Sequence, residues 1–258
     1  MISIGPAGTG GNTLEGLKKA SACGFTALEI PFTHGVRMGD ELAQEAGSLA
    51  KKLKIRLSVH APYYINLASD DRLKITQSEK RILDSCAKGH LLGADYIVFH
   101  AGFYQQKTGD KTYSMVKQSI IRMQERIRDA GWKKVILAPE ITGKPSQFGD
   151  MDELLRLKKE AGCGICIDFA HLEARQAGNL DYDEVFSRLK NLKHIHSHFS
   201  GIEYSEKGER RHVLTPAARM KELLTYVKKH GADITVINES PDPFGDSARM
   251  LKVLGSIF

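Results

Sequence analysis

The sequence predicts a (β/α)8 barrel, in which eight parallel strands alternate with eight helices. Its 258 residues alternate short apolar runs with amphipathic stretches, and eight such runs can be counted. Alternation of this kind predicts a parallel sheet with right-handed crossovers. Eight units in about 250 residues is the usual size of the barrel. The glycine-rich segment GPAGTGG lacks the spacing of a dinucleotide-binding loop, which argues against an open doubly wound sheet.

The predicted strands follow one another along the whole chain. They are ISI near the start, ALEI (27–30), RLSV (56–59), YIVF (96–99), KVILA (134–138), GICI (164–167), KHIHS (193–197) and ITVIN (234–238). Short apolar runs between turn residues are typical of buried strands. Stretches between them, such as LEGLKKASAC, have apolar residues every three or four positions, which predicts helices. Asn12 with Glu15 resembles a capping box at the start of the first helix.

The composition is that of a globular protein. Hydrophobic residues make up 41% of the chain and charged residues 26%, which are ordinary values for a protein with a packed core. No linker or low-complexity segment interrupts the pattern, so we predict a single domain over residues 1–258. No apolar run approaches the roughly 18 residues of a membrane span, and the first residues do not resemble a signal peptide. We therefore predict a cytoplasmic protein that does not bind membranes.

The net charge of +6 is typical of a protein with a polyanionic partner such as nucleic acid. Most basic residues are scattered, and only the segment ERRH at 209–212 concentrates them beside other candidate site residues. The four cysteines are too few for a disulfide framework. Cys163 and Cys166 form a C-x-x-C pair, but on a strand they would face opposite sides, so we expect them to serve packing.

Six consecutive predicted strands end in a residue that can bind a metal ion. These residues are His60, His100, Glu140, Asp168, one of the histidines His194, His196 and His198, and Glu239. The carboxyl ends of all strands in such a barrel meet on one face. A cluster of buried carboxylates and imidazoles without partners would be costly, and bound cations would compensate it. This mixture of ligands suits zinc or manganese better than magnesium or calcium.

The number of ligands predicts more than one ion. One ion would be held by Glu140, Asp168, a histidine of the seventh strand and Glu239. His60 and His100 would hold a second ion, with Glu140 able to bridge. His171 and His212 remain as candidates for a third. Period-two alternation puts all three histidines of the seventh strand on the same face, so the pattern does not choose among them.

Six motifs carry a resemblance to a known family. They are HAPYYINLAS (60–69), VFHAG (98–102), PEITGKPSQFG (139–149), CIDFAH (166–171), HSHFSG (196–201) and NESPD (238–242). In these motifs the chain resembles endonuclease IV, the metal-dependent apurinic/apyrimidinic endonucleases of base excision repair, from about residue 20 to 245. The resemblance implies a barrel with three zinc ions that cleaves double-stranded DNA 5′ to an abasic site. We predict two or three bound zinc ions, with Mn²⁺ as a substitute, and a monomer that acts on double-stranded DNA with abasic sites.

The resemblance also implies the ligands of each ion. The first zinc would be bound by His60, His100 and Glu140, and the second by Glu140, Asp168, His196 and Glu239. A gapless alignment of the seventh strand favours His196, with His198 as the alternative. His171 and His212 match two of the three ligands of the third zinc. Catalysis is assigned to Glu140, which is shared between two ions, and to Glu239.

Several residues are implied to bind the substrate. Tyr63 matches the loop residue that enters the DNA at the lesion, and Arg37 lies near the family's other inserted side chain. Asn66, in the first motif, is a further candidate for substrate binding.

The segment ERRH departs from the family, which has Asp-Arg-His at this place. An arginine cannot bind zinc, so the third ion would need Glu209 or water to complete its shell. Alternatively, Arg210 or Arg211 would contact the phosphate and stabilise its charge.

The main alternative is a sugar isomerase or epimerase of the same barrel superfamily. Such an enzyme binds one Mn²⁺ or similar ion through the set Glu140, Asp168, His196 and Glu239. It has no need for the additional histidines His60, His100, His171 and His212. A third interpretation is a barrel that binds DNA without cutting it.

Overall fold

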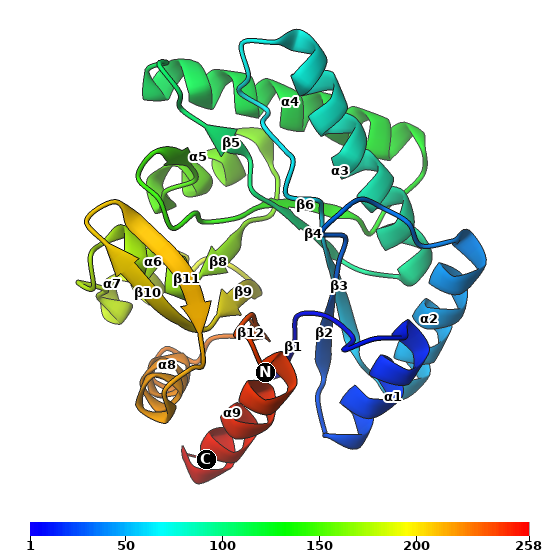
Figure 1. Cartoon of the computed structure of the whole chain (residues 1–258), viewed down its shortest axis with the longest axis vertical. Helices are drawn as coiled ribbons and strands as arrows, with labels where there is room; N and C mark the ends of the chain where they lie inside the picture. Colours follow the sequence, from blue (N-terminus) through cyan, green and yellow to red (C-terminus); the bar gives the residue numbers. More distant parts are fainter. Residues whose placement is uncertain (258) are drawn as a thin grey trace.

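Eight parallel strands of the computed structural model form a ring with helices packed around it, so the predicted (β/α)8 barrel is confirmed (Figure 1). The structure describes residues 1–257. The strands of the ring are β1 (Ile2–Pro6), β2 (Ala27–Pro31), β3 (Arg56–His60), β4 (Tyr96–Phe99), β6 (Ile136–Pro139), β8 (Cys166–Asp168), β9 (Ile195–Phe199) and β12 (Ile234–Asn238). Each of the eight predicted runs overlaps one of these strands.

Two ladders of four strands make up the ring, in the orders β2-β3-β4-β6 and β1-β12-β9-β8. Single parallel bridges, from Ala7 to Glu29 and from Glu140 to Cys166, join the ladders and close the barrel. Because every neighbouring pair is parallel, the carboxyl ends of all eight strands lie at the same end.

The helices outside the ring follow the strands along the chain, and the last of them comes after the final strand. They are α1 (Thr13–Ala22), α2 (Asp40–Leu53), α3 (Arg72–Leu92), α4 (Gly109–Asp129), α5 (Met151–Ala161), α6 (Phe169–Arg175), α7 (Tyr182–Leu189), α8 (Ala217–Lys229) and α9 (Pro243–Ile257). Asn12 caps α1, because its side chain accepts hydrogen bonds from the backbone N–H groups of Leu14 and Glu15. The predicted capping box is not completed, since the side chain of Glu15 pairs with Lys18. No helix within residues 1–257 is long and apolar enough to cross a bilayer.

Two antiparallel strand pairs lie beyond the carboxyl ends of the ring. One joins β5 (Gly102–Phe103) to β7 (Gln147–Phe148), and the other is the hairpin of β10 (Gly201–Ser205) and β11 (Gly208–Val213). Both strands of the hairpin contact α6 (Figure 1). The hairpin register changes between Glu203, which pairs with Arg211, and Tyr204, which pairs with Glu209. Arg210 is therefore the extra residue of a β-bulge.

The main core lies between the ring and the helices and is apolar, with residues such as Leu17, Ile82 and Phe99 fully buried. The four cysteines are free, and Cys163 and Cys166 are both buried. Cys163 precedes β8 and Cys166 lies within it, so only Cys166 belongs to the ring.

Candidate metal centre

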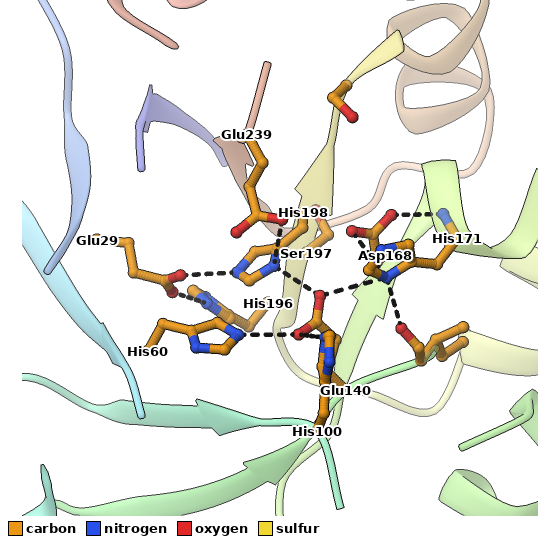
Figure 2. A network of polar contacts seen from close by, with 12 residues as sticks. Glu29, His60, His100, Glu140, Asp168, His171, His196, Ser197, His198 and Glu239 are labelled. Atoms are coloured by element: carbon orange, nitrogen blue, oxygen red, sulfur yellow. Dashed lines mark hydrogen bonds and ion pairs between the residues drawn. The ribbon is translucent and has the colours of Figure 1, made fainter. Parts of the chain in front are cut away.

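The carboxyl end of the barrel brings potential ligands together in three adjoining groups, and Figure 2 shows the two groups that share Glu140. The groups are His60, His100 and Glu140; Glu140, Asp168, His198 and Glu239; and His171, Glu209 and His212. Within each group, one ligand atom from every residue lies within 4.8 Å of the others. Such separations suit ligands that share a cation with bonds of about 2.0–2.2 Å.

Glu140 directs its two carboxylate oxygens at different groups. Oε2 lies 3.2 Å from Nε2 of His60 and 2.9 Å from Nε2 of His100. Oε1 lies 2.9 Å from Nδ1 of His198. Burial would raise the pKa of Glu140, but the charges of His198 and His100 hold it well below its usual value. The ionised carboxylate can therefore bridge two cation positions.

The tautomer of His60 follows from its backbone contact. Nδ1 lies 2.7 Å from the carbonyl oxygen of Ala61, which can only accept, so Nδ1 carries the hydrogen. In a neutral ring, Nε2 then presents its lone pair to the carboxylate of Glu140. Burial lowers the pKa of His60, but the hydrogen bond and charge of Glu140 outweigh it and raise the pKa to about 9. Without metal, a proton thus lies where a cation would fit between these two residues.

Asp168 has a buried oxygen without a hydrogen-bond donor. Oδ1 accepts from the backbone N–H of His171 at 2.7 Å, but Oδ2 has no hydrogen-bond partner. Nδ1 of His171 is only 3.2 Å from Oδ2, yet its hydrogen points to the carbonyl oxygen of Ile141 at 2.9 Å. Burial, followed by the charge of Glu140, raises the pKa of Asp168 to about 7. A cation would satisfy this oxygen, so the residues present fit a bound metal.

His198, and not His196, lies level with the other ligands. The parallel register pairs Asp168 with His198, whereas it pairs Cys166 with His196 two residues deeper in the barrel. Nδ1 of His198 is also 3.4 Å from Oε2 of Glu239. This geometry favours His198, the alternative from the sequence, over His196. Period-two alternation indicates on which face of the strand a side chain lies, but it does not indicate how deep in the barrel that side chain is.

The third group contains Glu209 in place of the aspartate that the sequence lacks. Nε2 of His171 lies 3.3 Å from Nε2 of His212 and 3.5 Å from Oε2 of Glu209. Because His171 donates from Nδ1 to Ile141, its Nε2 is free to bind a cation. Nδ1 of His212 contacts the hydroxyl of Ser200 at 2.7 Å, which leaves Nε2 of His212 facing the same point.

Two backbone features make room for the third group. On a regular strand, residues 209 and 212 would face opposite sides, but the bulge at Arg210 turns Glu209 and His212 to the same side. A Cβ atom on Gly143 would lie 2.7 Å from Cβ of Glu209 and 2.9 Å from Cδ2 of His171. The position therefore needs glycine for the group to form.

Glu29 is a buried residue of this region that the sequence analysis did not select. It is fully buried on β2 and contacts both His196 and His198. Burial would raise its pKa, but the charge of His198 and hydrogen bonds from both histidines lower it well below the usual value. A carboxylate in the middle of the apolar run ALEI was the signal that could have identified it.

A further group of Cys166, His196 and His198 has ligand atoms equally close together. It shares His198 with the centre described above. Burial raises the pKa of the Cys166 thiol well above its ordinary value, which keeps it protonated. Because the thiolate is the metal-binding form, we do not assign a cation to this group.

The predicted substrate-binding residues differ in their surroundings. Tyr63 is 56% exposed at the barrel mouth, and its ring centroid lies 5.5 Å from that of His60. A cavity of about 230 Å³ opens between Tyr63, Thr33, His60, His212 and Glu239. Three of the candidate ligands, His60, His212 and Glu239, therefore border this cavity.

The other predicted substrate-binding residues lie farther from the ligands or have local partners. Arg37 is exposed in the loop before α2, and Arg210 is exposed on the hairpin. Arg211 forms a two-pronged ion pair with Glu203 across the hairpin, at 2.9 and 2.8 Å. Oδ1 of Asn66 accepts from the backbone N–H of Ala68 at 3.1 Å, so Asn66 stabilises its own turn.

A family described as xylose isomerase-like TIM barrel matches residues 17–254. The uncharacterized protein MJ0133 of Methanocaldococcus jannaschii is 35% identical over 238 residues, covering 88% of this chain and 86% of that protein. A probable endonuclease 4 of Mycoplasma genitalium is 25% identical over 198 residues, covering 72% of this chain and 67% of that protein.

Solved structures with the same fold include nucleases and sugar-converting enzymes. Endonuclease IV from Thermus thermophilus aligns with a TM-score of 0.70 at 19% identity and covers 98% of both chains. A D-tagatose 3-epimerase-like protein aligns with a TM-score of 0.73, also at 19% identity, over 98% of this chain and 96% of that one. At such identities the likeness concerns the fold alone.

Proposed function

The chain belongs to the xylose isomerase-like TIM barrel family, and within it we propose that the protein is an endonuclease that hydrolyses DNA 5′ to an abasic site through two or three zinc ions. The observation that carries this proposal is the number of ligand groups. A mononuclear sugar isomerase needs only the group around Asp168 and His198. That chemistry does not use the pair His60 and His100, nor does it use the group of His171, Glu209 and His212.

The residues would divide between adjoining cations. The first would be held by His60, His100 and Glu140, the second by Glu140, Asp168, His198 and Glu239, and the third by His171, Glu209 and His212. When bound, such cations supply an activated water as nucleophile and neutralise the charge that develops on the phosphate. Glu140 fixes the spacing of the first two positions, because each of its oxygens faces a different group.

DNA fits the surroundings of the site. The net charge is +6, and Arg37 and Arg210 are exposed where they can contact backbone phosphates. An abasic nucleotide has no base to unpair, so turning it into the cavity beside Tyr63 costs little. The name of the Mycoplasma genitalium relative, probable endonuclease 4, supports the same substrate class. We further propose that the protein acts on double-stranded DNA as a monomer in the cytoplasm.

The proposal is tested by incision of a labelled duplex with one synthetic abasic site. We expect a single cut on the 5′ side that leaves a 3′-hydroxyl, is lost with a chelator and returns with zinc or manganese. Glu140→Gln should lower the rate by at least about 100-fold, the scale of losing one electrostatic group at an active site. Glu206→Gln, an exposed position in the hairpin turn, is the matched control. A Glu140→Gln protein that cuts at the parent rate would remove Glu140 from the mechanism.

A mononuclear sugar epimerase is the second candidate. It is favoured by one observation, namely that Glu140, Asp168, His198 and Glu239 form a complete four-ligand group. In that chemistry the two glutamates would act as acid and base on a ketose. Ketose epimerisation by the parent, without any incision of abasic DNA, would establish this candidate in place of the nuclease.

A further inference from the structure

Glu29 lies on β2 two residues deeper in the barrel than the level of His60, and three side chains contact it. Figure 2 shows its contacts with His196 and His198. The hydroxyl of Ser58 donates to Oε2 of Glu29 at 2.7 Å, and Nε2 of His196 lies 3.3 Å from the same oxygen. Nε2 of His198 lies 3.0 Å from Oε1. These four residues are at most 3% exposed, so water does not compete for the carboxylate.

Both ring nitrogens of His198 face carboxylates: Nδ1 faces Glu140 at 2.9 Å and Glu239 at 3.4 Å, and Nε2 faces Glu29. Glu140 and Glu239 belong to the ligand group of His198, so a cation held there would take the lone pair of Nδ1. The hydrogen of a neutral ring would then be on Nε2, where the carboxylate of Glu29 can accept from it. The Nε2–Oε1 contact has the distance of an ion pair, although it lacks the angle of an aligned hydrogen bond.

His196 is held in a different way. Its Nε2 contacts Oε2 of Glu29, and its ring stacks on Tyr96 with centroids 4.7 Å apart and planes inclined by 8°. The ring is therefore fixed between a carboxylate and an aromatic face, away from the level of Asp168. In this place His196 can donate to Glu29 and limit its movement.

We propose that Glu29 is a positioning residue of the metal centre, and that His196 holds Glu29 in place instead of binding metal. Glu29 fixes the ring of His198 and keeps the hydrogen on Nε2, so that Nδ1 is the ligand. This inference rests on the metal centre of the proposed function. Outer-shell carboxylates of this kind orient metal-binding histidines and increase their basicity, which explains why a carboxylate is kept inside an apolar strand.

The first test is zinc affinity, measured by competition with a chromophoric chelator. Glu29→Gln keeps the shape of the side chain but removes its charge. It also replaces one carboxylate oxygen by an N–H₂ group, which donates hydrogen bonds, so one oxygen is left to accept from the two histidines. We expect it to weaken one bound zinc by about 10–100-fold, as other outer-shell changes do, and to leave the remaining zinc unchanged. Glu206→Gln, the exposed position in the hairpin turn, is the matched control, because it makes the same chemical change outside the ligand groups. Its zinc affinities should stay close to those of the parent.

The second test needs no variant of Glu29 and therefore holds even if Glu29→Gln does not fold. Nitrogen NMR of histidine-labelled, zinc-loaded parent protein should show His198 with hydrogen on Nε2 and metal on Nδ1. The signal is assigned by its loss in His198→Gln. Hydrogen on Nδ1 of His198, or a Glu29→Gln protein that binds every zinc as tightly as the parent, would overturn the role of Glu29.

Both measurements are independent of nucleic acid. A protein that binds zinc as described but does not cut abasic DNA would contradict the proposed function and leave the role of Glu29 intact. A protein that cuts abasic DNA and whose Glu29→Gln variant binds zinc normally would contradict only the role of Glu29.

Discussion

Oε2 of Glu209 lies 3.5 Å from Nε2 of His171, although one residue belongs to the β10–β11 hairpin and the other to α6. The contact depends on the bulge at Arg210, which brings Glu209 to the same side of the strand as His212. In the proposed centre, Glu209, three positions before His212, would take the place of the aspartate that endonuclease IV has two positions before its histidine. The bulge adds the one residue that this difference requires.

Deletion of Arg210 should therefore remove a metal ion although it removes no ligand. Without the extra residue, period-two alternation would turn Glu209 away from His171 and His212. We expect elemental analysis to find one fewer tightly bound ion in the deletion variant. Arg210→Ala keeps the bulge and should keep the ion. A deletion variant with the metal content of the parent would show that the bulge does not position Glu209.

Gly143→Ala should disrupt the same group from the opposite side. The added methyl group would meet Cβ of Glu209 at 2.7 Å and Cδ2 of His171 at 2.9 Å, so these side chains would have to separate. Overpacking of this kind costs about 1–3 kcal/mol. We expect loss of one ion and a lower melting temperature. Gly109→Ala, at a position with open space around the added atom, is the control and should change neither. Full metal content in Gly143→Ala would mean that the group can adapt.

The barrel and the face that carries the site could be predicted from sequence, because both follow from local patterns. Apolar runs identify the strands, and the residue that follows each run is the one that lies at the carboxyl end of that strand, on the face that carries the site. His60, His100, Glu140 and Asp168 were predicted in this way, and the structure brings them close together. Glu29 could also have been found, since an acidic residue inside an apolar run needs a partner when it is buried.

The choice of His198 and the inclusion of Glu209 could not be derived from local patterns. The depth of a histidine along β9 depends on its register with β8, which is a property of two strands paired in space. The bulge at Arg210 depends likewise on the pairing of β10 with β11. Sequence periodicity gives neither register nor bulges, so the sequence could name His198 and Glu209 only as alternatives, and the structure was needed to favour them.

The two histidines of β9 should respond differently to substitution. His198→Ala removes a ligand, and we expect the affinity for one zinc to fall by more than about 100-fold, beyond the range of outer-shell changes. His196→Ala should keep the number of bound ions, although the cavity it leaves should lower the free energy of unfolding. Zinc titration and thermal unfolding of both variants distinguish these effects. Loss of an ion in His196→Ala alone would restore His196 as the ligand.

The metal-free protein should lose stability as the pH rises from 7 to 9. Burial opposes the charged form of His60, but the hydrogen bond and charge of Glu140 prevail and raise its pKa from 6.5 to about 9. A raised pKa means that the folded state holds a proton that the unfolded state has released above pH 6.5. This proton therefore contributes fully to the free energy of unfolding below pH 6.5, and its contribution is lost as the pH passes 9.

Zinc should abolish this pH dependence, because a cation takes the place of the proton between His60 and Glu140. The measurement is the melting temperature at pH 7, 8 and 9, with chelator and in zinc-loaded protein dialysed free of excess metal. We expect a fall only in the chelated sample. An unchanged or rising melting temperature in that sample would contradict the proton at His60.

The number of tightly bound metal ions per chain tests the multinuclear centre most directly. It is measured by elemental analysis of protein purified without chelator and then loaded with zinc. The three ligand groups predict two or three ions per chain, with at least one fewer in Glu140→Gln because its carboxylate is shared. One ion per chain, or none, that does not increase with added zinc or manganese would contradict the multinuclear centre and the nuclease proposed from it.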